Sequence, residues 1–211
     1  MMTQKDGLDT LTTLLNGRST IRTICMQTHR LFVMTNGATT RTQKGVRMIK
    51  HIKCDIFKSG ADIICHQVNC QGVMGSGIAK QVREKYPVVY EKYKHHCDIY
   101  SPKALLGIAQ FVGTQERHDT PFLGIFNLYA QEKYGYDGKQ YTNYDAIYKC
   151  LEKLKESIPE NPKREKYVVA IPYMMSCCRG GGNWETVYGF IEDILGNDER
   201  FDVLICEYNG G

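Results

Sequence analysis

The stretch His66-Gln67-Val68-Asn69-Cys70-Gln71-Gly72-Val73-Met74-Gly75-Ser76-Gly77-Ile78-Ala79 decides the fold of this chain. An apolar run from Ile63 to Cys65 leads into it, and a helical pattern follows it. A strand that turns through a glycine-rich loop into a helix start presents free backbone N–H groups and the positive end of a helix dipole, which attract phosphates. The glycines are spaced GxxGxG, so neither GxGxxG nor GxxxxGK[ST] fits. The sequence therefore predicts an anion-binding loop of another kind.

A second glycine cluster follows the predicted strand 166–173. It reads Met175-Ser176-Cys177-Cys178-Arg179-Gly180-Gly181-Gly182-Asn183-Trp184 and again leads into a helix start. One such loop also fits a tight connection between elements. Two of them, each at the carboxyl end of a strand, lie where open α/β sheets bind ligands. We therefore expect the two loops to hold a diphosphate from both sides.

Strands and helices alternate from Met48 onward. The predicted strands are 48–54, 61–68, 106–113, 122–130, 166–173 and 202–208, and the predicted helices are 75–86, 87–98, 142–157 and 184–195. Continuous apolar runs such as 167–171 and 203–206 are typical of strands that are covered on both faces. The pattern predicts an α/β fold: a three-layer α/β/α domain around a mixed, mostly parallel central sheet.

Helix boundaries are marked by capping residues. Thr142 can cap the helix that carries the apolar stripe from Tyr144 to Leu154, and Pro159 follows its end. Asn183 is a good N-cap for the last helix, which we expect to end at Gly196.

Residues 1–47 differ from the rest of the chain. They hold eleven threonines and show little sustained hydrophobic periodicity. Their net charge is +5; since the whole chain carries +4, residues 48–211 carry −1. We expect an N-terminal extension, 1–47, ahead of a folded domain, 48–211. A start codon assigned too far upstream, with Met48 as the natural start, would give the same contrast between residues 1–47 and 48–211.

The composition narrows the functional class. Apolar residues make up 42% of the chain, yet no window approaches the roughly 18 apolar residues of a membrane helix, and we see no signal peptide. The nine cysteines include no CxxC pair, which predicts free thiols and a cytoplasmic protein. His51-x-x-Cys54 and His95-His96-Cys97 lack a second pair at zinc spacing, so we expect no metal site.

These motifs resemble a known family. The pattern His66-x-x-Asn69-x-x-Gly72-x-Met74-Gly75-x-Gly77-Ile78-Ala79 resembles the first ligand loop of macrodomains, the ADP-ribose-binding modules. The segments 54–57 and 61–64 resemble the opening strand, turn and second strand of the family, and 171–185 resembles its phosphate loop and final helix. The resemblance covers residues 48–211 and lies nearest a branch that holds ADP-ribose glycohydrolases and an ADP-ribose-1″-phosphate phosphatase.

The resemblance implies roles for individual residues. Asp55 would accept a hydrogen bond from the adenine amino group, and the Ile56 backbone would flank the adenine. An Asp that only forms a turn after a strand would give the same sequence pattern. His66 and Asn69 would face the distal ribose, although His66 also fits a hydrogen-bonded core histidine. The phosphates would be held by two groups of residues: Gly75, Ser76, Gly77 and Ile78 for one, and Ser176, Cys177, Cys178 and Arg179 for the other. Residues 131–142 would form a lid over the distal ribose.

The sequence departs from the family at positions that matter for catalysis. Gln131 stands where the glycohydrolases of this branch use a lysine, and an amide cannot form a Schiff base. Lys133, two residues further on, is a weaker candidate for that role. Gly180 stands where one of those enzymes uses an acid, and no Asp occurs between Asn69 and Lys80. His66 remains the candidate general acid or base.

Three functions therefore compete. The first is hydrolysis of an ADP-ribose derivative, either ADP-ribose-1″-phosphate or an ADP-ribosylated protein or nucleic acid. The second is a non-catalytic reader of ADP-ribose or a related nucleotide signal. The third is a nucleic-acid-binding module that uses the basic residues 1–47. The expected partner is ADP-ribose or a derivative, with no cofactor and no membrane, and the expected state is a monomer.

Overall fold

The computed structural model describes residues 24–27, 30–33, 49–114, 123–135, 137–160 and 165–208. The chain forms two units, 1–46 and 47–211. In the first unit, β1 (Ile24–Gln27) and β2 (Arg30–Val33) pair in antiparallel fashion. Leu8, Leu11, Leu14 and Leu15 are spaced for one short helix, and these residues lie outside the described part of the chain.

A six-stranded sheet forms the centre of the second unit. Its strands are β3 (Ile49–Lys53), β4 (Ile63–Asn69), β5 (Ala109–Gly113), β6 (Gly124–Gln131), β7 (Tyr167–Pro172) and β8 (Phe201–Glu207). They are ordered β3-β8-β7-β4-β6-β5, and every pairing is parallel except that of β5 with β6. The predicted mixed, mostly parallel sheet is confirmed.

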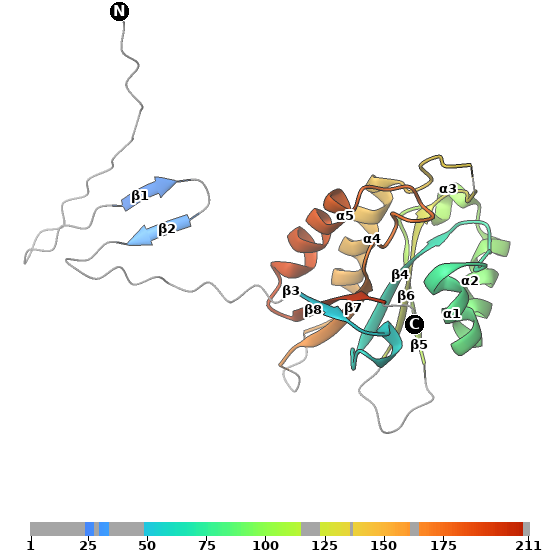
Figure 1. Cartoon of the computed structure of the whole chain (residues 1–211), viewed down its shortest axis with the longest axis horizontal. Helices are drawn as coiled ribbons and strands as arrows, with labels where there is room; N and C mark the ends of the chain where they lie inside the picture. The colour runs from blue at the N-terminus through green and yellow to red at the C-terminus, as the bar shows by residue number, and fades with distance from the viewer. Residues whose placement is uncertain are drawn as a thin grey trace, which may run out of the picture. The chain divides into compact units, whose positions relative to one another are not determined.

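Helices cover both faces of this sheet (Figure 1). One side carries α1 (Gly77–Lys85), α2 (Pro87–Ile99) and α3 (Pro102–Leu105), and the other carries α4 (Tyr144–Ser157) and α5 (Trp184–Ile191), which continues as the π-helical turn η2 (Glu192–Gly196). Alternate residues of β4 separate the two layers: Ile63 and Cys65 pack with α4 and α5, whereas Ile64 and Val68 pack with α1 and α2. The three-layer prediction is confirmed.

Two local expectations are corrected. Residues 102–105 form the short helix α3 instead of leading into a strand, because Pro102 occupies the first turn and Ser101 caps it, so β5 begins only at Ala109. The N-cap of α4 is Asn143, which accepts the Ala146 N–H at 2.9 Å, because the Thr142 hydroxyl is committed to the Ser176 carbonyl. The predicted N-cap Asn183 is confirmed, since it accepts the Thr186 N–H at 3.0 Å.

No helix within the described ranges is long and apolar enough to cross a membrane.

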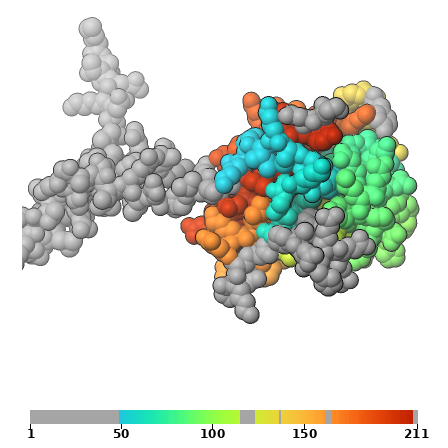
Figure 2. Space-filling model, turned by 60° about the horizontal axis from the view of Figure 1, so that its bottom comes forward, coloured from blue at the N-terminus to red at the C-terminus, as the bar shows by residue number. Residues whose placement is uncertain are grey.

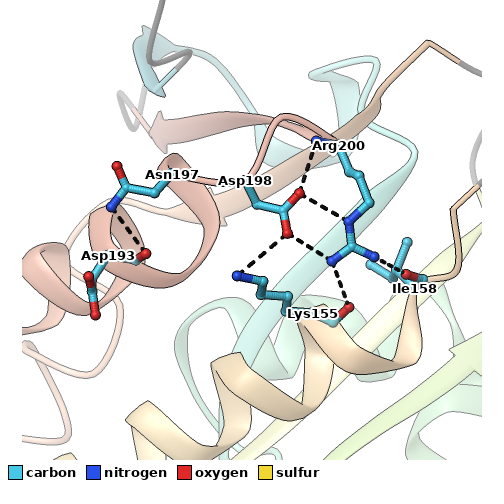
Figure 3. A network of polar contacts seen from close by, with 6 residues as sticks. All are labelled: Lys155, Ile158, Asp193, Asn197, Asp198 and Arg200. Carbon is cyan, nitrogen blue, oxygen red and sulfur yellow. Dashed lines mark hydrogen bonds and ion pairs between the residues drawn. The ribbon is translucent and has the colours of Figure 1, made fainter. Parts of the chain in front are cut away.

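An ion-pair network joins the end of α4 to the turn before β8 (Figure 3). Arg200 donates to the Asp198 carboxylate through Nε at 3.0 Å and Nη2 at 2.8 Å, and through Nη1 to the Ile158 carbonyl at 2.6 Å. The Lys155 ammonium lies 3.5 Å from the same carboxylate. These cations and donors lower the pKa of Asp198 to about 2, with the Arg200 hydrogen bonds as the main cause.

We predict that Asp198→Asn lowers the free energy of unfolding by about 1–2 kcal/mol at pH 7, because one charge-assisted network is lost from a partly solvated site. The pKa of the folded carboxyl is lowered, so its contribution is complete above its ordinary pKa near 4 and is lost as the pH falls toward 2. Urea unfolding of both proteins from pH 7 to pH 2 measures this.

The matched control is Glu156→Gln. Glu156 pairs with Lys153 on the exposed surface of α4, where both side chains are more than half exposed, so its loss should change the stability by less than about 0.5 kcal/mol. Equal effects of the two variants at pH 7 would contradict a special role of the Asp198 network.

Candidate functional site

A cavity of about 240 Å³ lies at the carboxyl ends of three adjacent strands. Three segments line it, each made of a strand end and the loop that follows: 67–69, 73 and 75–79 from β4, Gln131, Tyr134 and Gly135 from β6, and 172–176 and 178–180 from β7. β4 is the switch point of the sheet: β6 lies beside it on one side, and β7, which follows β6 along the chain, lies beside it on the other. Such a switch point is where open α/β sheets bind ligands.

The first loop is shaped by the side chain of Asn69. A bulge between Val68 and Asn69 shifts the register, so Asn69 faces Gln131 of β6. The Asn69 amide donates to the Val73 carbonyl at 2.6 Å, and its oxygen accepts the Gln71 N–H at 2.9 Å. The chain then passes Ser76, the N-cap residue of α1, whose side chain makes no capping bond. The first residues of α1, Gly77, Ile78 and Ala79, line the cavity, and the first N–H groups of a helix have no partner within it.

The second loop has a strained backbone. Met174 and Ser176 have φ values of 57° and 72°, which residues other than glycine seldom adopt. Such strain is held only where surrounding contacts enforce it, and it is frequent at binding sites. Cys178 and Arg179, which follow, are exposed and line the cavity.

A row of uncharged polar side chains forms the floor between these loops. The Ser176 hydroxyl donates to Gln67 Oε1, Gln67 Nε2 donates to Thr142 Oγ1 at 3.2 Å, and the Thr142 hydroxyl donates to the Ser176 carbonyl at 2.8 Å. Gln131, also buried, completes this floor. These groups satisfy one another, which keeps the second loop in its strained shape.

The loop after β6 is clamped to the second loop. The N–H groups of Tyr141 and Thr142 both donate to the Gly180 carbonyl, at 2.8 and 2.9 Å. A Cβ at Gly180 would overlap the Thr142 hydroxyl and the Ser176 carbonyl, so glycine is required there by close approach. Because Tyr134 and Gly135 of this loop line the cavity, the clamp fixes one wall of the site.

The structure corrects the expected position of His66. Its ring is fully buried, its Nε2 lies 2.8 Å from Asn127 Oδ1, and it does not line the cavity. Successive residues of a strand point to opposite faces, and Gln67 is the one directed at the site. Burial lowers the pKa of His66 to about 4. His66 is therefore a buried, neutral histidine at pH 7, bonded through Nε2 to Asn127 while its Nδ1 has no partner among the described residues.

Two further candidates also lie away from the cavity. Cys177 is buried, its thiol donates to the Met175 carbonyl at 3.2 Å, and its N–H donates to the Met174 carbonyl at 3.0 Å. Its backbone is thus engaged within the loop instead of offered to a phosphate. Lys133 is exposed and is absent from the cavity wall.

Asp55 and Ile56 are not part of the cavity wall. Asp55 caps the short 3-10 helix η1 (Ile56–Lys58) by accepting the Phe57 N–H at 3.0 Å, and Ile56 is buried in the core. Phe57 packs on Tyr86 after α1, with ring centroids 6.0 Å apart. Figure 2 shows this segment, in cyan, next to the green surface of α1 and α2. The adenine role of Asp55 stays a prediction.

The cavity wall includes residues that the sequence did not single out, among them Gln67 and Tyr173, whereas Tyr134 belongs to the expected lid 131–142. Gln67 lies inside the quoted stretch, one position after His66, and the alternation of a strand was the signal that could have selected it. Tyr134 and Tyr173 are both about two-fifths exposed, and each follows a strand that ends at the site.

The electrostatics of the cavity are simple. Among the described residues that line it, Arg179 is the only one with a charged side chain. The described part of the chain also contains no group of three His, Cys, Asp or Glu side chains that could hold a metal ion. The site is therefore suited to an anion that is held by backbone N–H groups and one guanidinium.

The three-layer α/β/α domain, with its six-stranded mixed sheet and a cavity at the carboxyl ends of its central strands, has the macrodomain fold. The macrodomain of Mycobacterium tuberculosis DarG superposes with a TM-score of 0.61 at 23% identity, covering 78% of this chain and 99% of that one. At this identity the likeness establishes the fold.

Curated relatives extend the comparison to the sequence, although no model of a known protein family matches it. An uncharacterised 17.5 kDa protein of Enterobacteria phage T4 is 30% identical over 164 residues, covering 76% of this chain and 97% of the phage protein. The ADP-ribose 1″-phosphate phosphatase of Scheffersomyces stipitis is 40% identical over 76 residues, covering 32% of this chain. This chain spans less than half, 44%, of that relative. The chain belongs to the macrodomain family.

We predict that Gly180→Ala lowers the free energy of unfolding by about 1–3 kcal/mol, because the added methyl overlaps Thr142 and the Ser176 backbone and forces the two loops apart. Gly189→Ala is the control, since a methyl at this position of α5 meets nothing within 4 Å and should leave the stability unchanged or slightly raised. Chemical unfolding measures both, and a stable Gly180→Ala protein would show that the loops are not clamped.

Proposed function

We propose that this macrodomain binds ADP-ribose and its derivatives in the cavity at the ends of β4, β6 and β7. The observation that carries the proposal is the meeting of the α1 N-terminus and the strained loop 174–180 across one cavity whose only charged lining side chain, among the described residues, is Arg179. Two phosphate-binding loops that face each other suit a diphosphate. The match to an ADP-ribose 1″-phosphate phosphatase supports the same ligand.

The order of the strands supports an orientation for this ligand. Asp55 and Ile56 follow β3 at one edge of the sheet, and Asn69 and Gln131 follow β4 and β6, beyond β8 and β7. We place adenine beside Asp55 and the distal ribose beside Asn69 and Gln131. The diphosphate then lies between them, against residues 75–78 and the second loop at Ser176, Cys178 and Arg179.

The first candidate activity is hydrolysis of ADP-ribose-1″-phosphate or of an ADP-ribosylated target. The named activity of the Scheffersomyces relative supports this activity. A Schiff-base route has no support in this chain, because an amide, Gln131, occupies the cavity where a lysine would be needed. We therefore favour phosphate release, in which water attacks the 1″-phosphoryl group beside Asn69 and Gln131, inorganic phosphate leaves and ADP-ribose keeps the oxygen.

A reader of ADP-ribose is the second candidate function. The observation that favours it is the chemistry of the wall: its described residues contribute no carboxylate, imidazole or amine to act as a general acid or base. A reader needs only affinity, which backbone N–H groups and the polar floor supply.

We further propose that the protein acts in the cytoplasm as a monomer. The eight cysteines of the described domain are free thiols, the state that a reducing compartment maintains. Light scattering of the purified protein tests the monomer.

We predict that wild type binds ADP-ribose with a Kd of about 1–10 μM, about −7 to −8 kcal/mol, and that Arg179→Gln weakens binding about tenfold through loss of a charged contact. Arg83→Gln is the control, because Arg83 packs over Tyr90 outside the cavity wall and should leave the Kd unchanged. Calorimetry measures both. The absence of binding by wild type at millimolar ADP-ribose would contradict the proposed function.

A second prediction separates hydrolase from reader. Release of inorganic phosphate from ADP-ribose-1″-phosphate, if this chain is a hydrolase, should persist within about threefold in His66→Gln, since the buried ring is neutral and does not line the cavity. Glutamine keeps a hydrogen-bonding group for Asn127. A loss beyond tenfold with unchanged stability and binding would return His66 to the mechanism. Tight binding by wild type without phosphate release would select the reader.

A further inference from the structure

One face of α2 supports the first loop of the site. Tyr90, Tyr93, Lys94 and Cys97 recur at helical spacing, and each approaches the segment 69–73. Tyr90 OH lies 3.5 Å from the Gly72 carbonyl, and a Cβ at Gly72 would lie 2.8 Å from Lys94 Cδ and 3.5 Å from Cys97 Cβ. Gly72 itself has φ of 73°. The loop therefore rests directly on this helix face and has little room to move toward it.

Tyr93 makes the strongest of these contacts. Its hydroxyl lies 2.9 Å from the backbone oxygen of Asn69 and 2.9 Å from Asn69 Oδ1, and it donates its single proton to this pair of acceptors. The same Oδ1 accepts the N–H groups of Gln71 and Val73, at 2.9 and 3.4 Å. Tyr93 thus fixes the orientation of the one amide around which the loop is folded.

Tyr93 is itself held firmly. It is completely buried, and its ring packs on Tyr129 with centroids 5.6 Å apart. The Tyr129 hydroxyl lies 3.3 Å from both the Tyr93 carbonyl and Gln110 Oε1. Burial raises the pKa of the Tyr93 phenol above its ordinary value, so the hydroxyl keeps its proton. A rigid donor beneath Asn69 is what the helix provides.

We propose that Tyr93, which does not touch the cavity, is a positioning residue that sets the ligand-binding shape of the first loop by orienting Asn69. This inference rests on the proposed function for its choice of ligand. Asn69 follows β4, at the end of the site away from Asp55, so Tyr93 governs the distal ribose and its substituent, not the adenine. Loss of its hydroxyl frees the Asn69 amide to rotate and loosens the turn that ends at Val73.

The first test compares ligands. Tyr93→Phe should weaken ADP-ribose about five- to tenfold while changing AMP, which lacks the distal ribose, by less than twofold. Tyr148→Phe is the control, because it removes a phenol hydroxyl that bonds Asp193 between α4 and η2, away from the first loop and the cavity wall, so its Kd values should stay within twofold. A merely structural loss would weaken both ligands alike, and that result would overturn the proposal.

The second test asks whether Tyr93 acts through Asn69. In a double-mutant cycle, Tyr93→Phe added to Asn69→Ala should weaken ADP-ribose by less than a further twofold, since the group that it orients is already gone. Full additivity of the two losses would overturn the proposal.

The third test needs no ligand, so it separates failure of this inference from failure of the proposed function. In free Tyr93→Phe, amide hydrogen exchange at Gln71 and Val73 should accelerate at least tenfold, with β8 amides unchanged. Exchange at Gln71 and Val73 that matches wild type would overturn the proposal, whether or not ADP-ribose binds. Accelerated exchange in a protein that does not bind ADP-ribose would support the Tyr93–Asn69 coupling and reject the ligand.

Discussion

The parallel pairing of β4 with β6 on one side and with β7 on the other is the constraint on which the site depends. It brings three carboxyl ends to the same edge of the sheet, although their residues are far apart in the chain. Both faces of β4 are covered, so the strand cannot slip without moving polar groups into one of two apolar layers. The loops that leave these strands therefore start from fixed points.

From these points the loops stabilise one another. The floor of Gln67, Thr142 and Ser176 is internally hydrogen-bonded, and Gly180 accepts the backbone of the loop after β6. This mutual support explains why left-handed φ values persist at Met174 and Ser176, which would otherwise cost about 1–3 kcal/mol each. The first loop has a separate support, the face of α2 beneath Asn69. The two halves also contact each other, since the Cys70 N–H donates to the Gln131 carbonyl at 2.8 Å and the Tyr134 N–H lies 3.4 Å from Gln71 Oε1.

The chemistry of the cavity separates affinity from catalysis. The described lining residues include the amides Asn69 and Gln131 and one guanidinium, Arg179, but no carboxylate or imidazole. If ADP-ribose lies as proposed, its distal ribose meets Asn69, Gln131 and the loop that carries Tyr134. In that orientation, these residues are the ones that would separate a hydrolase from a reader.

The sequence by itself determined the strands, the layer architecture, the two glycine loops and the Asn183 cap, because each follows from local pattern and backbone chemistry. It could not determine which way His66 points. A strand that is buried on both faces shows no polar alternation, and the partner of His66, Asn127, lies 61 residues away. Thr142 and Asn143 are equally good caps locally, and only the contact of Thr142 with Ser176, 34 residues on, assigns the cap to Asn143. Gln67, Tyr93 and Gly180 likewise gain their roles from long-range contacts, which the tertiary structure alone decides.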